Sequence, residues 1–137
     1  MNKNLLITIL YFLFVSISYG QLVSLNPPFA TQYDNVTITY NAAEGNAALV
    51  GVSPVYMHTG VITNFSDNET DWQHVQGNWG TADPNVLLTL VGNDLWEISF
   101  NINDFYGLLP GETVTQLAFV FRNTDGTIVG KDRKSVV

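Results

Sequence analysis

The sequence predicts an all-β fold built as an antiparallel sandwich, and three observations support this. Its 137 residues form short runs rich in β-branched and aromatic residues, separated by Gly, Asn, Asp and Pro. No segment longer than a few residues has helical periodicity. The chain has no cysteine, so its stability must come from a hydrophobic core rather than from disulfides. The length beyond residue 20 suits one domain with a two-layer core.

The first twenty residues have the pattern of a secretory signal peptide. A short start containing Lys3 precedes an apolar run at residues 5–17, and small residues Ser18 and Gly20 precede the expected cleavage site. The run is shorter than the roughly 18 to 20 residues that span a bilayer. We therefore expect residues 1–20 to be removed, residues 21–137 to form a single module, and the mature protein to be secreted without a membrane anchor. The location could be extracellular, at the cell surface or periplasmic.

The first half of the module contains three expected strands. Residues 21–25 form a first strand that Asn26-Pro27-Pro28 ends, and residues 36–40 alternate with Val36, Ile38 and Tyr40 facing inward. Residues 50–59 are expected as a longer strand, in which Pro54 indicates a sheet edge or a bulge. Residues 64–71 are polar and acidic, which is typical of a surface loop.

The second half contains the clearest hairpin. Residues 73–76 are expected as a short strand, and residues 86–91 and 95–102 flank the turn Gly92-Asn93-Asp94. A single helical turn is expected at residues 104–107.

The remaining elements complete the sandwich. Residues 114–122 alternate strongly, and a turn at residues 123–126 leads to a last strand at residues 127–131. Seven to eight strands in about a hundred residues are typical of an immunoglobulin-like antiparallel β-sandwich. The central core is expected from aromatic residues on the apolar side of alternating strands: Trp96, Phe100, Phe119 and Phe121.

The charge balance excludes some classes of partner. The full chain has a net charge of −7, and loss of Lys3 with the signal peptide leaves a net charge of −8. An acidic protein repels nucleic-acid phosphates and anionic membrane surfaces, so neither is expected as a partner. Low charge content with many Asn, Thr and Gly residues fits a neutral ligand.

No catalytic set is visible in the sequence. It has no G-x-S-x-G, H-E-x-x-H or glycine-rich phosphate motif, and His58 and His74 are its two histidines. Glycosidases hold two carboxylates about 5 to 9.5 Å apart across a cleft, whereas the acids here are scattered over loops. We therefore expect no enzymatic activity within this chain, although a glycoside hydrolase domain could follow it in a longer protein.

The acidic loop carries a weak calcium signal. Asp67, Glu69 and Asp71 stand at alternate positions, like the first ligands of a calcium loop. The sixth position is Trp72 rather than glycine, and the twelfth is Asn78 rather than glutamate. A plain surface loop is the favoured interpretation and calcium is the alternative; no other cofactor is expected.

Two tryptophans give the main functional signal. Trp72 and Trp79 lie in the polar, glycine-rich residues 71–80. An exposed indole offers a flat apolar face to a sugar ring, while nearby polar groups satisfy its hydroxyls. Asn78, His58 and Tyr56 could supply those groups. The alternative is that one tryptophan caps the core while the other is only half exposed.

Several segments together resemble a known family. Their order resembles that in the immunoglobulin-like modules at the N-termini of secreted α-amylase-family enzymes and related exported proteins of Bacteroidetes. The segments are residues 55–61, 72–80, 95–98 and 119–123, with Asp125-Gly126 and Gly130-Lys131.

These modules are similar to starch-binding sandwich domains, in which two aromatic residues and a few polar ones grip an α-glucan. The resemblance implies Trp72 and Trp79 as the platform, with Arg122, Asn123 or Lys131 as hydroxyl partners. The sequence therefore favours a non-catalytic carbohydrate-binding module for α-glucan (starch or glycogen), covalently linked to an extracellular glycoside hydrolase. The first alternative is a structural immunoglobulin-like spacer that packs against a catalytic domain and binds no glycan; the second is an adhesin-like, protein-binding sandwich.

Overall fold

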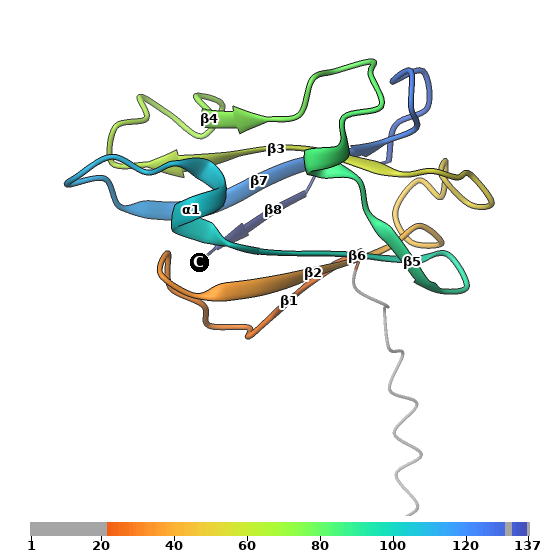
Figure 1. Cartoon of the computed structure of the whole chain (residues 1–137), viewed down its shortest axis with the longest axis horizontal. Coiled ribbons are helices and arrows are strands. Elements are labelled where there is room, and N and C mark those ends of the chain that lie inside the picture. Colours follow the sequence, from red (N-terminus) through yellow and green to blue (C-terminus); the bar gives the residue numbers. More distant parts are fainter. Residues whose placement is uncertain (1–21, 131–132, 137) are drawn as a thin grey trace, which may run out of the picture.

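Two antiparallel sheets of four strands each face one another in the computed structural model, which describes residues 22–130 and the backbone of residues 133–136 (Figure 1). The first sheet has the order β1 (Val23–Asn26), β2 (Asn35–Asn41), β6 (Leu95–Asn101), β5 (Thr89–Gly92). The second has the order β4 (Gln73–Gln76), β3 (Tyr56–Thr63), β7 (Val114–Arg122), β8 (Arg133–Val136). A 3₁₀ helix, η2 (Pro84–Val86), and a short α-helix, α1 (Ile102–Tyr106), lie in the connections.

The strand order confirms the predicted fold class. If the strands are lettered A, B, C, C′, D, E, F and G along the chain, the first sheet is A-B-E-D and the second is C′-C-F-G. Immunoglobulin-like sandwiches divide their strands between two sheets in this way. Within the described residues, no helix is long and apolar enough to cross a membrane.

Alternating residues of the two sheets form the core between them. Val36, Ile38 and Tyr40 are buried as the alternation of β2 predicts, and Tyr40 stacks on Phe121 of β7 with ring centroids 3.9 Å apart. Predicted core residues Trp96, Phe119 and Phe121 are buried.

Phe100 is a correction to the predicted core, because its side chain is only half-buried. It stands near the end of β6, packs against the core from its margin and stacks on Phe105 of α1 with ring centroids 4.2 Å apart. The helix thus covers Phe100, which the alternation of the strand alone assigns to the centre of the core.

The helix α1 closes one end of the sandwich. The side chain of Asn101 accepts a hydrogen bond from the Asp104 N–H, and Gly107 ends the helix in the left-handed conformation at φ 66°. The Tyr106 hydroxyl lies 2.7 Å from Thr59 Oγ1, which donates to the Ala118 carbonyl at 2.7 Å. This buried chain of hydrogen bonds connects the helix to β3 and β7.

Three strand boundaries differ from those predicted. The strand expected at residues 50–59 begins at Tyr56, because turns occupy the residues before it, including Gly51 at φ 70°. Residues 84–86 form a helical turn, so that the strand expected at residues 86–91 is Thr89–Gly92. The expected last strand contributes only a bridge between Val129 and Arg122, and β8 begins at Arg133.

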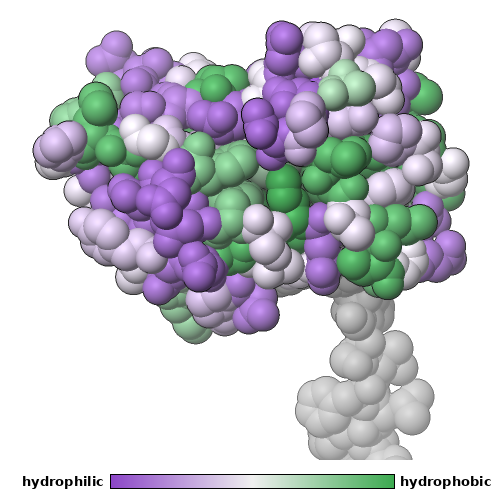
Figure 2. Space-filling view, viewed as in Figure 1, coloured by the Kyte–Doolittle hydropathy of each residue, from purple (hydrophilic) through white to green (hydrophobic). Residues whose placement is uncertain are grey.

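The surface of residues 22–130 has no exposed lysine or arginine. Arg122 is the one lysine or arginine in residues 22–130, and it is fully buried. In the space-filling view, hydrophobic residues reach the surface near the middle, between hydrophilic residues on both sides (Figure 2). The surface of residues 22–130 therefore presents neutral and acidic groups to a ligand.

The core predicts a large stability difference between two phenylalanines. Phe121→Ala removes a fully buried ring that stacks on Tyr40 and should lower the free energy of unfolding by about 3 to 5 kcal/mol. Phe29→Ala removes a ring that is 93% exposed and should change it by less than about 0.5 kcal/mol. Urea denaturation of both variants measures the difference, and equal losses would contradict this assignment of the core.

Candidate functional site

An aromatic row, defined as Trp72, His58 and Trp79, lies on the outer face of the second sheet. Because Met57 and Thr59 point into the core, His58 between them points away from it. Its ring centroid lies 6.4 Å from that of Trp72 and 5.3 Å from that of Trp79, with the Trp79 ring perpendicular to it. The two tryptophans thus flank one imidazole.

Trp72 is the more buried end of this row. It lies over Gly60 of β3, where an added Cβ would stand 3.0 Å from the Trp72 Cβ and 3.2 Å from the Gln73 carbonyl oxygen. Trp72 is half-buried. Sequence reasoning missed Gly60, although its spacing of two from His58 on an alternating strand places both on one face.

Trp79 is the exposed end of the row, with 45% of its surface open. One ring face is covered by the Arg122 guanidinium, whose carbon lies 5.4 Å from the ring centroid. The indole also rests on Gly126, where an added Cβ would come within 2.5 Å of Trp79 Nε1. These contacts hold the indole in place while 45% of it stays exposed.

Arg122 fixes the position of Trp79 from below. Its Nη1 donates to the carbonyls of Asn123 and Thr124 at 3.0 and 2.8 Å, and its Nη2 donates to those of Asn78 and Thr81 at 3.1 and 3.0 Å. The guanidinium also lies 5.0 Å from the Tyr56 ring centroid. It therefore joins the loop that carries Trp79 to the turn after β7.

The structure separates the expected sugar-contacting residues into two groups. Asn78 is exposed beside Trp79, and His58 is half-buried within the aromatic row. Arg122 and Tyr56 are buried beneath it, at 0% and 5% exposure, so their place in the fold is structural rather than at the surface.

Asn123, another expected hydroxyl partner, does not join the exposed group. Asn123 Oδ1 accepts from the Ile128 N–H at 3.0 Å, and its Nδ2 donates to Thr127 Oγ1 at 3.1 Å. The Asn123 side chain is thus engaged within its own turn. Lys131 lies outside the described residues.

His58 has one buried ring nitrogen. Nδ1 is buried against Gly77 without a hydrogen bond of good geometry. Burial lowers the pKa of His58 from its usual 6.5, the positive charge of Arg122 lowers it further, and the Gly77 backbone opposes the shift. Both larger effects favour the neutral imidazole.

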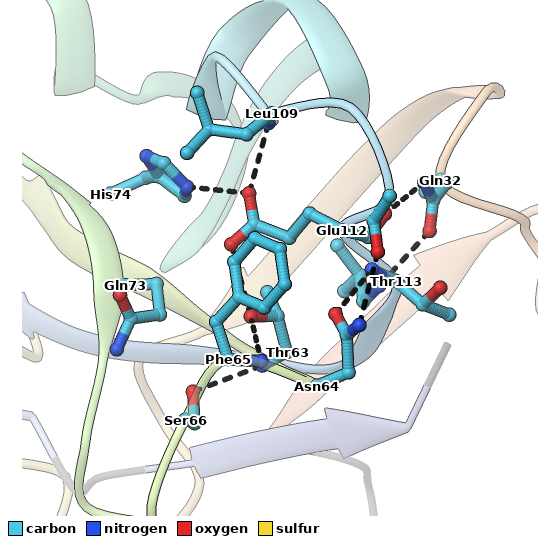
Figure 3. Close-up of polar contacts among 12 residues, drawn as sticks. Gln32, Thr63, Asn64, Phe65, Ser66, Gln73, His74, Leu109, Glu112 and Thr113 are labelled. Atoms are coloured by element: carbon cyan, nitrogen blue, oxygen red, sulfur yellow. Dashed lines mark hydrogen bonds and ion pairs between the residues drawn. The ribbon is translucent and has the colours of Figure 1, made fainter.

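A second polar cluster surrounds Glu112 at the far end of β3 (Figure 3). The Glu112 side chain is fully buried, and its Oε1 accepts from His74 Nε2 at 2.7 Å and from the Leu109 N–H at 3.0 Å. Its Oε2 accepts from Thr63 Oγ1 at 3.0 Å. His74 therefore turns away from the aromatic row and connects β4 to the loop before β7.

Sequence reasoning missed this cluster. His74 and Glu112 are 38 positions apart, and neither belongs to a motif. Burial raises the pKa of Glu112, but hydrogen bonds from Leu109, His74 and Thr63 outweigh it, and the pKa lies below its usual value of 4.5. The cluster thus holds an ionised carboxylate inside the protein.

The acidic loop is organised by its own hydrogen bonds. The Asp67 N–H donates to Asp71 Oδ2 at 2.9 Å, and Asn68 Oδ1 accepts from the Thr70 N–H and hydroxyl at 2.8 and 2.6 Å. In the part of the chain that the structure describes, no three acidic, histidine or cysteine residues are grouped to hold a metal ion. The calcium site suggested for Asp67, Glu69 and Asp71 stays a prediction.

The fold and this surface define an immunoglobulin-like sandwich with a partly exposed row of aromatic residues on one sheet. The chain belongs to a family described as Domain of unknown function (DUF8578), whose model matches residues 23–129. This span runs from β1 through the turn after β7 and so includes the aromatic row, Arg122 and Glu112. No curated protein matches the chain.

Loss of the Arg122 hydrogen bonds should loosen the loop that carries Trp79. Arg122→Met keeps an apolar side chain of similar length but leaves four carbonyls without their donor, which should cost roughly 3 kcal/mol of unfolding free energy. The Trp79 emission should shift to the red as its ring becomes more hydrated. Arg122→Lys, which keeps the charge and some of the hydrogen-bond donors, should lose less unfolding free energy than Arg122→Met. A Met variant as stable as the wild type would contradict the structural role of Arg122.

The lowered pKa of Glu112 predicts a pH-dependent contribution to stability. Because the folded pKa lies below the usual 4.5, the contribution is fully present above pH 4.5 and is lost as the pH falls through the folded pKa. Urea midpoints of the wild type and Glu112→Gln should therefore differ most at neutral pH and converge in acid. A gap that stays constant from pH 7 to pH 3 would contradict the burial of an ionised carboxylate.

Proposed function

We propose that this protein is a non-catalytic carbohydrate-binding module and that Trp79 is its principal sugar platform. The observation that carries the proposal is the state of this indole: 45% of it is exposed, although Arg122, Gly126 and His58 hold it in place. An exposed aromatic side chain that is already fixed loses little conformational entropy when a ligand binds.

The neighbours of Trp79 suit a pyranose ring. The C–H groups of a sugar stack on an indole face, while its hydroxyls need hydrogen-bonding partners. The exposed side chain of Asn78 and the half-buried imidazole of His58 lie beside the indole and can provide them. Trp72 extends the apolar surface on the other side of His58.

The charge around the row favours a neutral glycan. Arg122, the one arginine within residues 22–130, is buried. Two acids stand close to Trp79: Asp83 accepts from the Asn78 N–H at 3.0 Å, and the Asp125 carbonyl oxygen would lie 3.5 Å from a Cβ added at Gly80. These carboxylates would repel a uronic acid polymer, and residues 22–130 have no exposed lysine or arginine to attract it. Among neutral polymers, the resemblance to starch-binding modules favours α-glucan.

In this proposal the module acts by tethering. It is secreted, and in a longer protein it would hold an attached glycoside hydrolase on its polymer. Binding of the module raises the effective concentration of substrate at the attached domain, even when each sugar contact is weak. The chemistry would then belong to that attached domain.

Affinity electrophoresis tests the proposal. The purified protein should be retarded in native gels that contain soluble starch, and Trp79→Ala should weaken binding about tenfold, as loss of one stacking contact predicts. Trp72→Ala should weaken it less, because that indole is half-buried. Phe29→Ala, which removes an exposed aromatic residue outside the row, is the matched control and should bind like the wild type.

Glycogen, xylan and laminarin gels extend the comparison to other neutral polymers. Retardation by one of these polymers, but not by starch, would support carbohydrate binding and would replace α-glucan with that polymer as the ligand. No retardation by any of the four would overturn the proposal and favour the spacer role.

A further inference from the structure

The position of His58 restricts how a sugar could bind to the aromatic row. The imidazole lies between the two indoles, so a ligand that bridges Trp72 and Trp79 passes over it. Its Nδ1 is buried against Gly77, whereas the ring as a whole is only half-buried. The exposed part of the ring is therefore the edge that carries Nε2.

A neutral imidazole carries its proton on one of its two ring nitrogens. The tautomer that is protonated on Nδ1 leaves a lone pair on Nε2, at the exposed edge of the ring. Nε2 is then a hydrogen-bond acceptor. A sugar hydroxyl lying between the indoles can donate to it.

We propose that Nε2 of neutral His58 is the specificity-determining acceptor of this site, which receives a hydrogen bond from a sugar hydroxyl between the two indoles and releases it when the imidazole is protonated. This inference rests on the proposed carbohydrate-binding function. It adds that the ligand must present a hydroxyl that donates a hydrogen bond at this position, and that the affinity for the ligand depends on pH.

Protonation would weaken binding because it removes the acceptor. The imidazolium has two N–H donors and no acceptor, so the sugar hydroxyl loses its partner. The positive charge of the buried Arg122 opposes this protonation and so helps to lower the pKa of His58 in the folded protein.

The other charged and titratable groups around His58 have contacts of their own. Tyr56 lies under the Arg122 guanidinium, and His74 of β4 is turned to Glu112. Asp83 accepts from the Asn78 and Asn85 N–H groups, and Asp125 accepts from the N–H and hydroxyl of Thr127. Arg122 is thus the charged group whose effect on His58 the structure identifies, and that effect favours the neutral ring.

The pH dependence of glycan binding tests this role. Binding of the wild type to starch, glycogen, laminarin and xylan is measured from pH 8 to pH 4.5. For the polymer that binds, affinity should be constant at neutral pH and should fall about three- to tenfold below pH 6.5, the usual pKa of histidine, as the lowered pKa is passed.

Two variants separate hydrogen bonding from aromatic packing. His58→Gln supplies an uncharged acceptor and should bind with an affinity that no longer falls in acid. His58→Phe keeps an aromatic ring in the row but has no acceptor, so it should bind weakly at every pH. His74→Gln, which changes the histidine that contacts Glu112, is the control and should keep the wild-type profile.

Tryptophan fluorescence of the free protein provides a readout that needs no glycan. An imidazolium beside an indole quenches its emission, so emission should fall with acid in the wild type and less in His58→Gln. If emission titrates while glycan affinity does not, this inference is overturned and the proposed function stands. Binding by His58→Phe at wild-type strength would overturn it as well, and the absence of binding to all four polymers would overturn both proposals.

Discussion

A single buried guanidinium holds together the part of the molecule on which the proposed site depends. Arg122 ends β7, lies beneath Trp79 and donates to carbonyls of two separate loops. Backbone carbonyls at loop ends usually find water as their partner, but here a charged donor replaces it. Because the same group covers the Tyr56 ring and one face of Trp79, the geometry of the indole is coupled to the packing of the strand.

Alternation along the strands allowed much of the fold to be predicted. Val36, Ile38 and Tyr40 share a face because successive residues of β2 point to opposite sides, and the same rule places Phe119 and Phe121 in the core. The rule works poorly where a strand ends, since turn geometry then decides the position of each side chain. Phe100 illustrates this, because its half-buried ring stacks on Phe105 of α1.

The candidate site could be predicted only in part. A polar, glycine-rich context indicated that Trp79 lies near the surface, and its neighbour Asn78 is exposed as well. Arg122 was expected among the ligand contacts because of the family resemblance. Its burial was not foreseen, since arginines are rarely buried without a partner and the partners here are backbone carbonyls that no sequence pattern marks. The contact between His74 and Glu112 depends on tertiary packing across 38 positions and left no local signal.

The burial of Arg122 has a consequence for proteolysis. Trypsin cleaves after lysine and arginine, and residues 22–130 contain one such residue, whose side chain is enclosed in the folded protein. The scissile bond after Arg122 can enter a protease only once β7 and its neighbouring turn have opened. In the folded state, residues 22–130 therefore present no accessible cleavage site to proteases of trypsin-like specificity, and this resistance does not depend on a disulfide.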